Sequence, residues 1–136
     1  MDPLSITVAC VSLTASIAKT SVSVSTFVRA VRSARSDLDA VSRELASLTT
    51  LLELIAEDAE DIENLPKPLR KHIAGILTNC ELVLVEVQRL IAKYDQPGIV
   101  KGSKWALAGS EDVVKLQLSL EAHKSALEIA LEMLTL

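Results

Sequence analysis

The sequence predicts an all-α domain, an antiparallel four-helix bundle, on three observations. Apolar residues make up 49% of the 136 positions, yet only Phe27, Tyr94 and Trp105 are aromatic, so the core must be aliphatic. Four glycines and four prolines, nearly all between positions 66 and 109, leave few turns. Elsewhere apolar residues recur every three or four positions, as on the packed face of a helix.

The first segment, residues 4–32, is predicted to be a helix although part of it alternates like a strand. Serine and valine alternate from Ser21 to Ser25, and β-branched residues are frequent in strands. One strand would have no partner in this chain, which favours the helix. The expected buried stripe is Ile6, Cys10, Leu13, Ile17, Val24, Phe27 and Val31, with Thr20 or Ser21 filling the gap.

Residues 36–63 and 66–94 form the two most regular predicted helices. Ser36 or Asp37 can cap the first of them, and Pro66 and Pro68 are tolerated in the first turn of the second. The acidic end of the 36–63 helix is either a solvated face near the basic start of the next helix or a partner-binding patch. The two expected buried stripes are Leu38, Val41, Leu45, Leu48, Leu52, Ile55, Ala59 and Ile62, then Leu69, Ile73, Ile76, Cys80, Val83, Val87, Leu90 and Tyr94.

The fourth predicted helix, residues 110–136, begins at Ser110 after a short loop or turn that contains Trp105. This pattern is unfinished at Leu136, which predicts one domain over 1–136 that is the N-terminal part of a longer protein. Trp105, near Lys101 and Lys104, either closes one end of the core or anchors the domain at a membrane interface. The expected stripe is Val113, Leu116, Leu120, His123, Leu127, Ala130 and Leu134.

The charge distribution favours a bundle and gives no support for nucleic-acid binding. The net charge is −4, whereas a nucleic-acid binder would present a basic face. Net charges of +3 over 1–36, −8 over 37–64, +4 over 65–105 and −3 over the remainder alternate in sign. The alternation predicts attraction between antiparallel neighbours, although exposed pairs each contribute under roughly 1 kcal/mol.

The sequence contains no recognisable catalytic or metal-binding constellation. Cys10 and Cys80 lie on apolar stripes and are expected to be buried thiols in a reducing cytosol. His123 is expected to be a hydrogen-bonded residue of the packing stripe, and His72 lies on another helix; the spacings of these four residues match no zinc motif. The chain is therefore predicted to be no enzyme and to use no cofactor, metal or small-molecule substrate.

The N-terminal segment does not have the features of a signal peptide or a permanent membrane anchor. Only Asp2 precedes the apolar run, where a signal peptide needs basic residues. The uncharged run from Pro3 to Ala18 is 16 residues long, short of the ~20 that span a bilayer. The protein is expected to be cytoplasmic at rest.

The chain resembles the helical domain at the N-terminus of fungal STAND proteins, the NOD-like receptors of filamentous fungi. The resemblance rests on the opening MDPLSI, on Phe27-Val28-Arg29, on Ser103 to Leu107, and on Leu120 to Leu131 with its LE-x-HK-x-x-L pattern. That family is related to HeLo-like domains and to the N-terminal bundle of the mixed-lineage-kinase-like pseudokinase. One departure is that the first helix has no glycine, so its sequence does not match a glycine-zipper mode of assembly.

The resemblance implies a cell-death effector of innate immunity. Such a domain would oligomerise on activation of the attached receptor, move to the plasma membrane and permeabilise it through the N-terminal helix. Its implied partners are lipids, anionic ones above all, further copies of itself, and the other domains of the receptor. Lys19 is the only charge between Pro3 and Val28. The residues expected to insert are Leu4, Ile6, Val8, Val11, Leu13 and Ile17.

Two other functions remain open from the sequence. One is a non-lytic signalling adaptor that pairs with the matching domain of another protein through the acidic end of the second helix and Lys67, Arg70 and Lys71. The other is an autoinhibitory or solubilising module with no activity of its own. Lys67, Arg70, Lys71, Lys101, Lys104 and Trp105 are the candidate interface or anchor residues.

Overall fold

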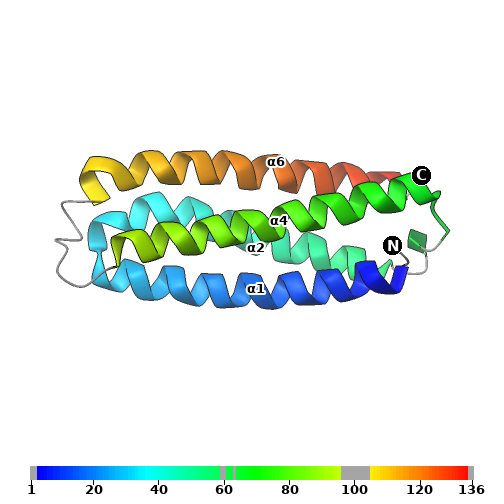
Figure 1. Ribbon diagram of the computed structural model, residues 1–136, viewed down its shortest axis with the longest axis horizontal. Helices are drawn as coiled ribbons and strands as arrows, with labels where there is room; N and C mark the ends of the chain where they lie inside the picture. Colours follow the sequence, from blue (N-terminus) through cyan, green and yellow to red (C-terminus); the bar gives the residue numbers. More distant parts are fainter. Residues whose placement is uncertain (1–2, 59–60, 63, 96–104, 135–136) are drawn as a thin grey trace.

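The computed structural model describes residues 3–58, 61–62, 64–95 and 105–134, and it confirms the all-α bundle (Figure 1). Four long helices pack side by side: α1 (Pro3–Ala30), α2 (Arg35–Glu57), α4 (Lys67–Tyr94) and α6 (Ser110–Leu134). Two short elements join them, the 3₁₀ turn η1 (Arg32–Ala34) and the π-helical turn η2 (Trp105–Gly109). The segment from Ser21 to Ser25 lies inside α1, so the prediction of a helix there is confirmed.

The four helices form a ring in which α1 and α6 occupy opposite corners. Each of these two packs against both α2 and α4. Consecutive helices run in opposite directions, as predicted, but the adjacent pairs α1 with α4 and α2 with α6 are parallel (Figure 1). The link between α2 and α4 therefore crosses the end of the bundle diagonally, and the bundle is only partly antiparallel between neighbours.

This ring order contradicts part of the charge argument. The two segments of net positive charge, which contain α1 and α4, lie side by side, and so do the two negative segments, which contain α2 and α6. Some cross-helix ion pairs form nevertheless, such as Lys124 Nζ with Glu44 Oε2 at 2.9 Å between α6 and α2. Burial of the apolar stripes outweighs surface charge pairs of under roughly 1 kcal/mol, so packing decides which helices are neighbours.

The predicted stripes form one continuous core. Every apolar residue of the α1 stripe is buried, and the gap in that stripe is filled by Thr20, whose Oγ1 accepts a hydrogen bond from Gln88 Nε2 at 3.2 Å. The α4 face is broader than predicted, because Leu77, Leu84 and Ile91 are buried beside the expected stripe. Leu69 and His123 are only half-buried, and Ala59 and the side chain of Leu134 lie outside the described residues.

The start of α2 differs from the prediction. Neither Ser36 nor Asp37 caps it; Ala34 stands at the N-cap position and makes no side-chain capping bond. The chain enters α2 through η1, where the Arg35 N–H already donates to the Arg32 carbonyl oxygen. A helical turn in front of α2 thus takes over part of the role of a capping side chain. At its other end α2 stops at Glu57, earlier than the predicted residue 63.

An aromatic cluster closes the end of the bundle where α1 and α4 finish. Trp105 packs against Phe27 and Tyr94, with ring centroids 5.3 Å away in each case, and is 1% exposed. Its indole Nε1–H donates to Asp37 Oδ2 at 2.9 Å. Trp105 therefore closes the core, one of its two predicted roles. It lies in a π-helical turn that leads into α6, where the sequence predicted a loop or turn.

Gly109 is expected to be required by this cluster. A Cβ at that position would lie 2.5 Å from Cδ2 and Cε3 of the Trp105 ring. Because the ring is buried and cannot swing away, Gly109→Ala should lower the free energy of unfolding by about 1–3 kcal/mol through overpacking. Urea denaturation followed by circular dichroism measures this, with Gly75→Ala as control, since Gly75 is exposed and a Cβ there meets nothing within 4 Å. An unchanged midpoint for Gly109→Ala would contradict the close contact.

Candidate functional site

The candidate site is α1, which is apolar on two faces. Its inner face carries a buried row of residues that belongs to the core, and we call this row the inner stripe of α1. It consists of Ile6, Cys10, Leu13, Ile17, Val24 and Phe27. On its outer face Val8, Val11 and Val22 are 60%, 63% and 67% exposed, and Ala15 and Ala18 between them are exposed too. We call Val8, Val11, Ala15, Ala18 and Val22 the outer stripe of α1. Its spacing of three and four puts these residues on one side of the helix, away from the core.

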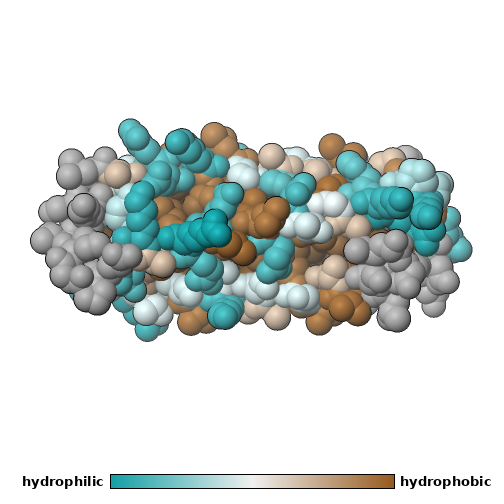
Figure 2. All heavy atoms as spheres, viewed as in Figure 1, coloured by the Kyte–Doolittle hydropathy of each residue, from teal (hydrophilic) through white to brown (hydrophobic). Residues whose placement is uncertain are grey.

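The residues predicted to insert into a membrane divide between the two faces. Ile6, Leu13 and Ile17 are buried, whereas Val8 and Val11 are exposed; the side chain of Leu4 lies outside the described residues. Sequence reasoning grouped them by hydrophobicity and missed that the exposed part continues to Val22. Figure 2 shows hydrophobic atoms reaching the lower edge of the molecule, over α1, and the upper edge, over α6.

Thr14 and Ser23 of α1 form hydrogen bonds within the helix itself. Thr14 Oγ1–H donates to the Cys10 carbonyl oxygen at 2.8 Å, and Ser23 Oγ–H donates to the Lys19 carbonyl oxygen at 3.3 Å. Because donor and acceptor belong to the same helix, these hydrogen bonds persist as long as the helix does, whatever surrounds it. Transfer of α1 to an apolar environment would therefore leave neither hydroxyl without a partner.

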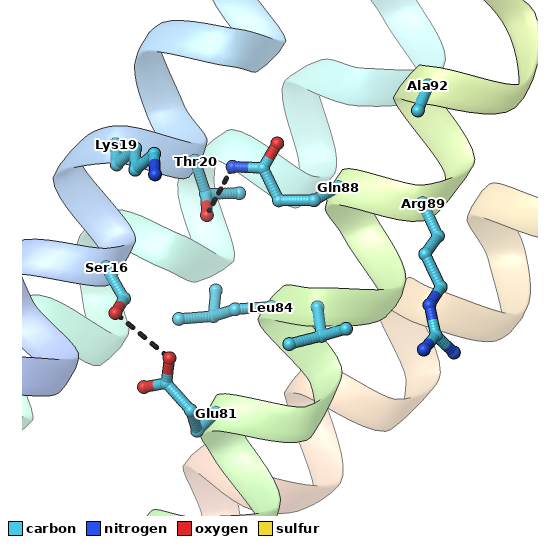
Figure 3. A pocket seen from close by; sticks show the side chains of 9 residues that line it. Ser16, Lys19, Thr20, Glu81, Leu84, Gln88, Arg89 and Ala92 are labelled. Atoms are coloured by element: carbon cyan, nitrogen blue, oxygen red, sulfur yellow. Dashed lines mark hydrogen bonds between the residues drawn. The ribbon is translucent and has the colours of Figure 1, made fainter.

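Two side-chain hydrogen bonds join α1 to α4. Ser16 Oγ–H donates to Glu81 Oε1 at 3.0 Å, and Gln88 Nε2–H donates to Thr20 Oγ1 at 3.2 Å. Figure 3 shows the two bonds with Leu84 between them. They border an open hollow of about 530 Å³. On this side α1 is held to α4 by apolar packing and by these two hydrogen bonds, only one of which involves a charged group, Glu81.

Three arginines gather where α1 passes into α2. Arg29, Arg32 and Arg35 are exposed and line an open hollow of about 730 Å³ together with Ser25 and Val28. Arginine presents a fork of donors that suits phosphate groups. The sequence prediction overlooked this cluster; its signal was the spacing of three between successive arginines, which a 3₁₀ turn places on one side.

The predicted basic interface residues have different environments. Lys67 and Lys71 are exposed at the start of α4, and Arg70 is half-buried. Glu57 and Asp61, from the acidic end of the preceding helical segment, are exposed as well. Lys101 and Lys104 lie outside the described residues. Trp105 is buried, so a role as membrane anchor, which stays a prediction, would require its ring to leave the core.

The cysteines and histidines have structural environments. Burial raises the pKa of the Cys10 thiol to about 11, and burial together with the nearby charge of Glu81 raises that of Cys80 to about 12. His123 Nδ1 lies 2.6 Å from the Ser119 carbonyl oxygen, as expected of a hydrogen-bonded boundary residue, and His72 is exposed. Within the described ranges, no three His, Cys, Asp or Glu side chains gather as a metal site.

Both thiols are expected to resist modification in the folded protein. A rise of the Cys10 pKa from 9.0 to about 11 lowers the thiolate fraction at pH 8 about 100-fold, since each unit is a factor of ten. A chromogenic aromatic disulfide should therefore react with both thiols, Cys10 and Cys80, only after the protein is unfolded in urea. Because the folded pKa values lie above 9.0, their contribution to stability should be lost as the pH rises beyond 9.0. Fast reaction in buffer would contradict the burial.

Comparison with known proteins identifies the family. No curated protein and no solved structure matches the chain significantly. A family model does match, over residues 1–136, and its description is the N-terminal region of the pigment biosynthesis cluster protein PigL. This match covers the four helices, the aromatic cluster and the outer stripe of α1 together. The chain thus belongs to the family of PigL N-terminal domains.

Proposed function

We propose that this domain is a non-enzymatic, membrane-permeabilising cell-death effector of a fungal NOD-like receptor, related to the HeLo-like bundles. In this proposal it is cytoplasmic at rest and acts at the plasma membrane after activation, when copies associate and α1 exchanges its place in the bundle for lipid. The observation that carries the proposal is that α1 is apolar on both its buried and its exposed face.

The dimensions and composition of α1 support this role. Among the described residues, Ile6–Ala30 is long and apolar enough to cross a bilayer. A helix of 28 residues is about 42 Å long at 1.5 Å per residue, more than the ~30 Å hydrocarbon core. Lys19 is the only charge from Pro3 to Val28, and lysine can extend its ammonium group along the helix toward water.

The resting state follows from the same helix. In the bundle the inner stripe of α1 is buried against α2 and α4, which keeps the more continuous of its two apolar faces from water. The outer stripe stays exposed and is available to lipid before any rearrangement. Activation then requires only that the contacts of the inner stripe with α2 and α4 be replaced by contacts with lipid or with other copies of α1.

The arginine cluster supplies a first contact with anionic headgroups in this proposal. Arg32→Gln with Arg35→Gln should weaken binding to vesicles containing phosphatidylserine by about 2 kcal/mol, roughly 30-fold, at about 1 kcal/mol per basic residue near the surface. Co-sedimentation at low and high salt measures it. Both side chains are exposed, so the fold should persist. Equal binding of the double variant and the native protein would remove the cluster from the mechanism.

Dye release from anionic vesicles tests the proposed function as a whole. The intact domain, alone or fused to an inducible dimeriser, should release the dye, and neutral vesicles should leak less. Deletion of the first 19 residues is a poor variant, because it would remove Ile6, Leu13 and Ile17 from the core. Vesicles that stay sealed even with the dimerised protein would refute permeabilisation.

The exposure of Lys67 and Lys71, at the end of the bundle where α2 finishes, keeps the adaptor function as the second candidate. Lys67→Glu with Lys71→Glu separates the two. If the domain is an adaptor, this variant should lose binding to the partner domain and keep its affinity for vesicles. If it acts on membranes through α1, dye release should stay within about twofold, because exposed charges contribute little to the fold.

A further inference from the structure

A second apolar face lies on the outside of α6. Leu118 and Ile129 are 61% and 58% exposed, and they belong to a row of residues three or four apart. We call this row the outer stripe of α6. It consists of Val114, Leu118, Ala122, Ser125, Ile129 and Met133, all of them exposed. A stripe of this kind on a helix normally faces another helix.

The outer stripes of α1 and α6 cannot meet within one molecule. The two helices occupy opposite corners of the ring (Figure 1), and the residues of both outer stripes are exposed. Figure 2 shows hydrophobic atoms at both edges of the molecule, over α1 and over α6. One molecule therefore presents two different apolar surfaces that point in opposite directions.

The charges beside the two stripes are complementary. From Pro3 to Ala30 the chain has two basic residues, Lys19 and Arg29, and no acidic one. From Ser110 to Leu134 it has five acidic residues against Lys115 and Lys124. Contact between two copies of α1 would bring like charges together, whereas contact between α1 and α6 of different molecules joins opposite ones.

One parallel alignment satisfies both the apolar and the charged residues. With Val11 opposite Leu118, the same spacing sets Val22 opposite Ile129. Lys19 directly follows Ala18 of its stripe and Glu121 directly precedes Ala122 of the other, so in a parallel pair the two charges border the contact on the same side. Small residues then meet at the middle of the contact, where they allow close approach of the helices: Ala15, Ala18, Ala122 and Ser125.

The antiparallel alternative lacks this match. An antiparallel contact that places Val22 opposite Leu118 also aligns the apolar rows and sets Arg29 opposite Glu111, but it puts Lys19 and Glu121 on opposite sides of the contact. Lys19 then lies on the side of Lys115, a like charge. Charge complementarity along the stripes therefore selects the parallel arrangement.

We propose that the outer stripe of α1 in one molecule docks parallel on the outer stripe of α6 in a second copy. The contact is heterologous, so it repeats from copy to copy and builds a ring or an open chain. This proposal rests on the self-association in the proposed function and adds which two surfaces meet. The inner stripe of α1 remains in its own bundle, and the contact forms without lipid.

Cross-linking in solution tests the proposal. Val22→Cys in one sample and Ile129→Cys in another add single exposed thiols, and the native Cys10 and Cys80 are buried. A mixture treated with a short bismaleimide should give the cross-linked pair at least about tenfold faster than a mixture of Val22→Cys and Leu54→Cys, because docking creates a high local concentration. Leu54 is an exposed leucine on α2 and serves as the matched control.

A charge exchange makes the test specific. Lys19→Glu in the Val22→Cys molecule should slow the reaction with Ile129→Cys, and Glu121→Lys in the second molecule should restore it. Both residues lie at the surface or half-buried, and circular dichroism checks their folding. Equal rates with Leu54→Cys, faster coupling of Val22→Cys to itself, or no restoration by the exchange would each overturn the proposal. Since no lipid is present, failure here leaves permeabilisation standing, and sealed vesicles leave this contact standing.

Discussion

Replacing Trp105 by alanine should lower the free energy of unfolding by about 3–5 kcal/mol, the usual cost of truncating a fully buried aromatic side chain. Trp105 is 1% exposed and stacks its ring edges against Phe27 and Tyr94, each at a centroid distance of 5.3 Å. The substitution would open a cavity where α1, α2, α4 and α6 meet. It would also remove the hydrogen bond that the Asp37 carboxylate now accepts from the indole N–H at 2.9 Å.

Chemical denaturation followed by circular dichroism measures this effect, since the variant has no tryptophan fluorescence. Trp105→Phe is the matched control: it keeps an aromatic ring and loses only the hydrogen bond and part of the volume, so its cost should be about 1–3 kcal/mol. A Trp105→Ala variant within 1 kcal/mol of the native protein would show that the cluster is not what closes this end of the bundle.

Acidic residues on the outer stripe of α1 should abolish dye release without unfolding the bundle. Val11 and Ala15 are exposed, so Val11→Glu with Ala15→Glu changes no core contact, and surface substitutions usually shift stability by about 0.5 kcal/mol or less. Each charge carried into the hydrocarbon costs about 2.5 kcal/mol or more on insertion scales. Two of them should reduce insertion by several thousandfold.

The control for this variant is a pair of glutamates on α2. Thr50→Glu with Leu54→Glu has the same spacing and adds the same net charge at exposed positions away from α1. It should retain dye release within a few fold. If both pairs abolish release equally, the effect is one of net charge; if neither does, the outer stripe does not enter the membrane. Either result would contradict the proposed role of α1.

Much of the fold follows from the sequence because the helical period is explicit in it. The inner stripes of α2 and α4 recur at three and four without a break, and nearly all of their described members are buried. The same period predicted Thr20 or Ser21 in the core, and the structure places Thr20 there. A local rule failed at Asp37: its position suited an N-cap, but its carboxylate instead accepts a bond from Trp105, 68 residues away. Such a long-range partner leaves no local trace.

The outer stripes and the ring order were not evident from the sequence for a different reason. Ile6, Leu13 and Ile17 already supply the one apolar face that a packed helix needs, so the pattern does not call for a second face. Val22 lies in the alternating segment that also suited a strand. The order of helices around the bundle depends on how side chains fit across four interfaces. The net charges of the segments are too weak a signal to select one order of helices among those possible.

The depth of α1 in a membrane tests the central claim most directly. A spin label on Val11→Cys and one on Leu54→Cys, each in the otherwise native chain, should behave alike in buffer, where both side chains are exposed. With anionic vesicles the label at position 11 should become accessible to oxygen and shielded from a water-soluble relaxing agent, while the label at position 54 stays in water. If position 11 remains in water on vesicles that have bound the protein, α1 does not exchange the bundle for lipid and the account is wrong.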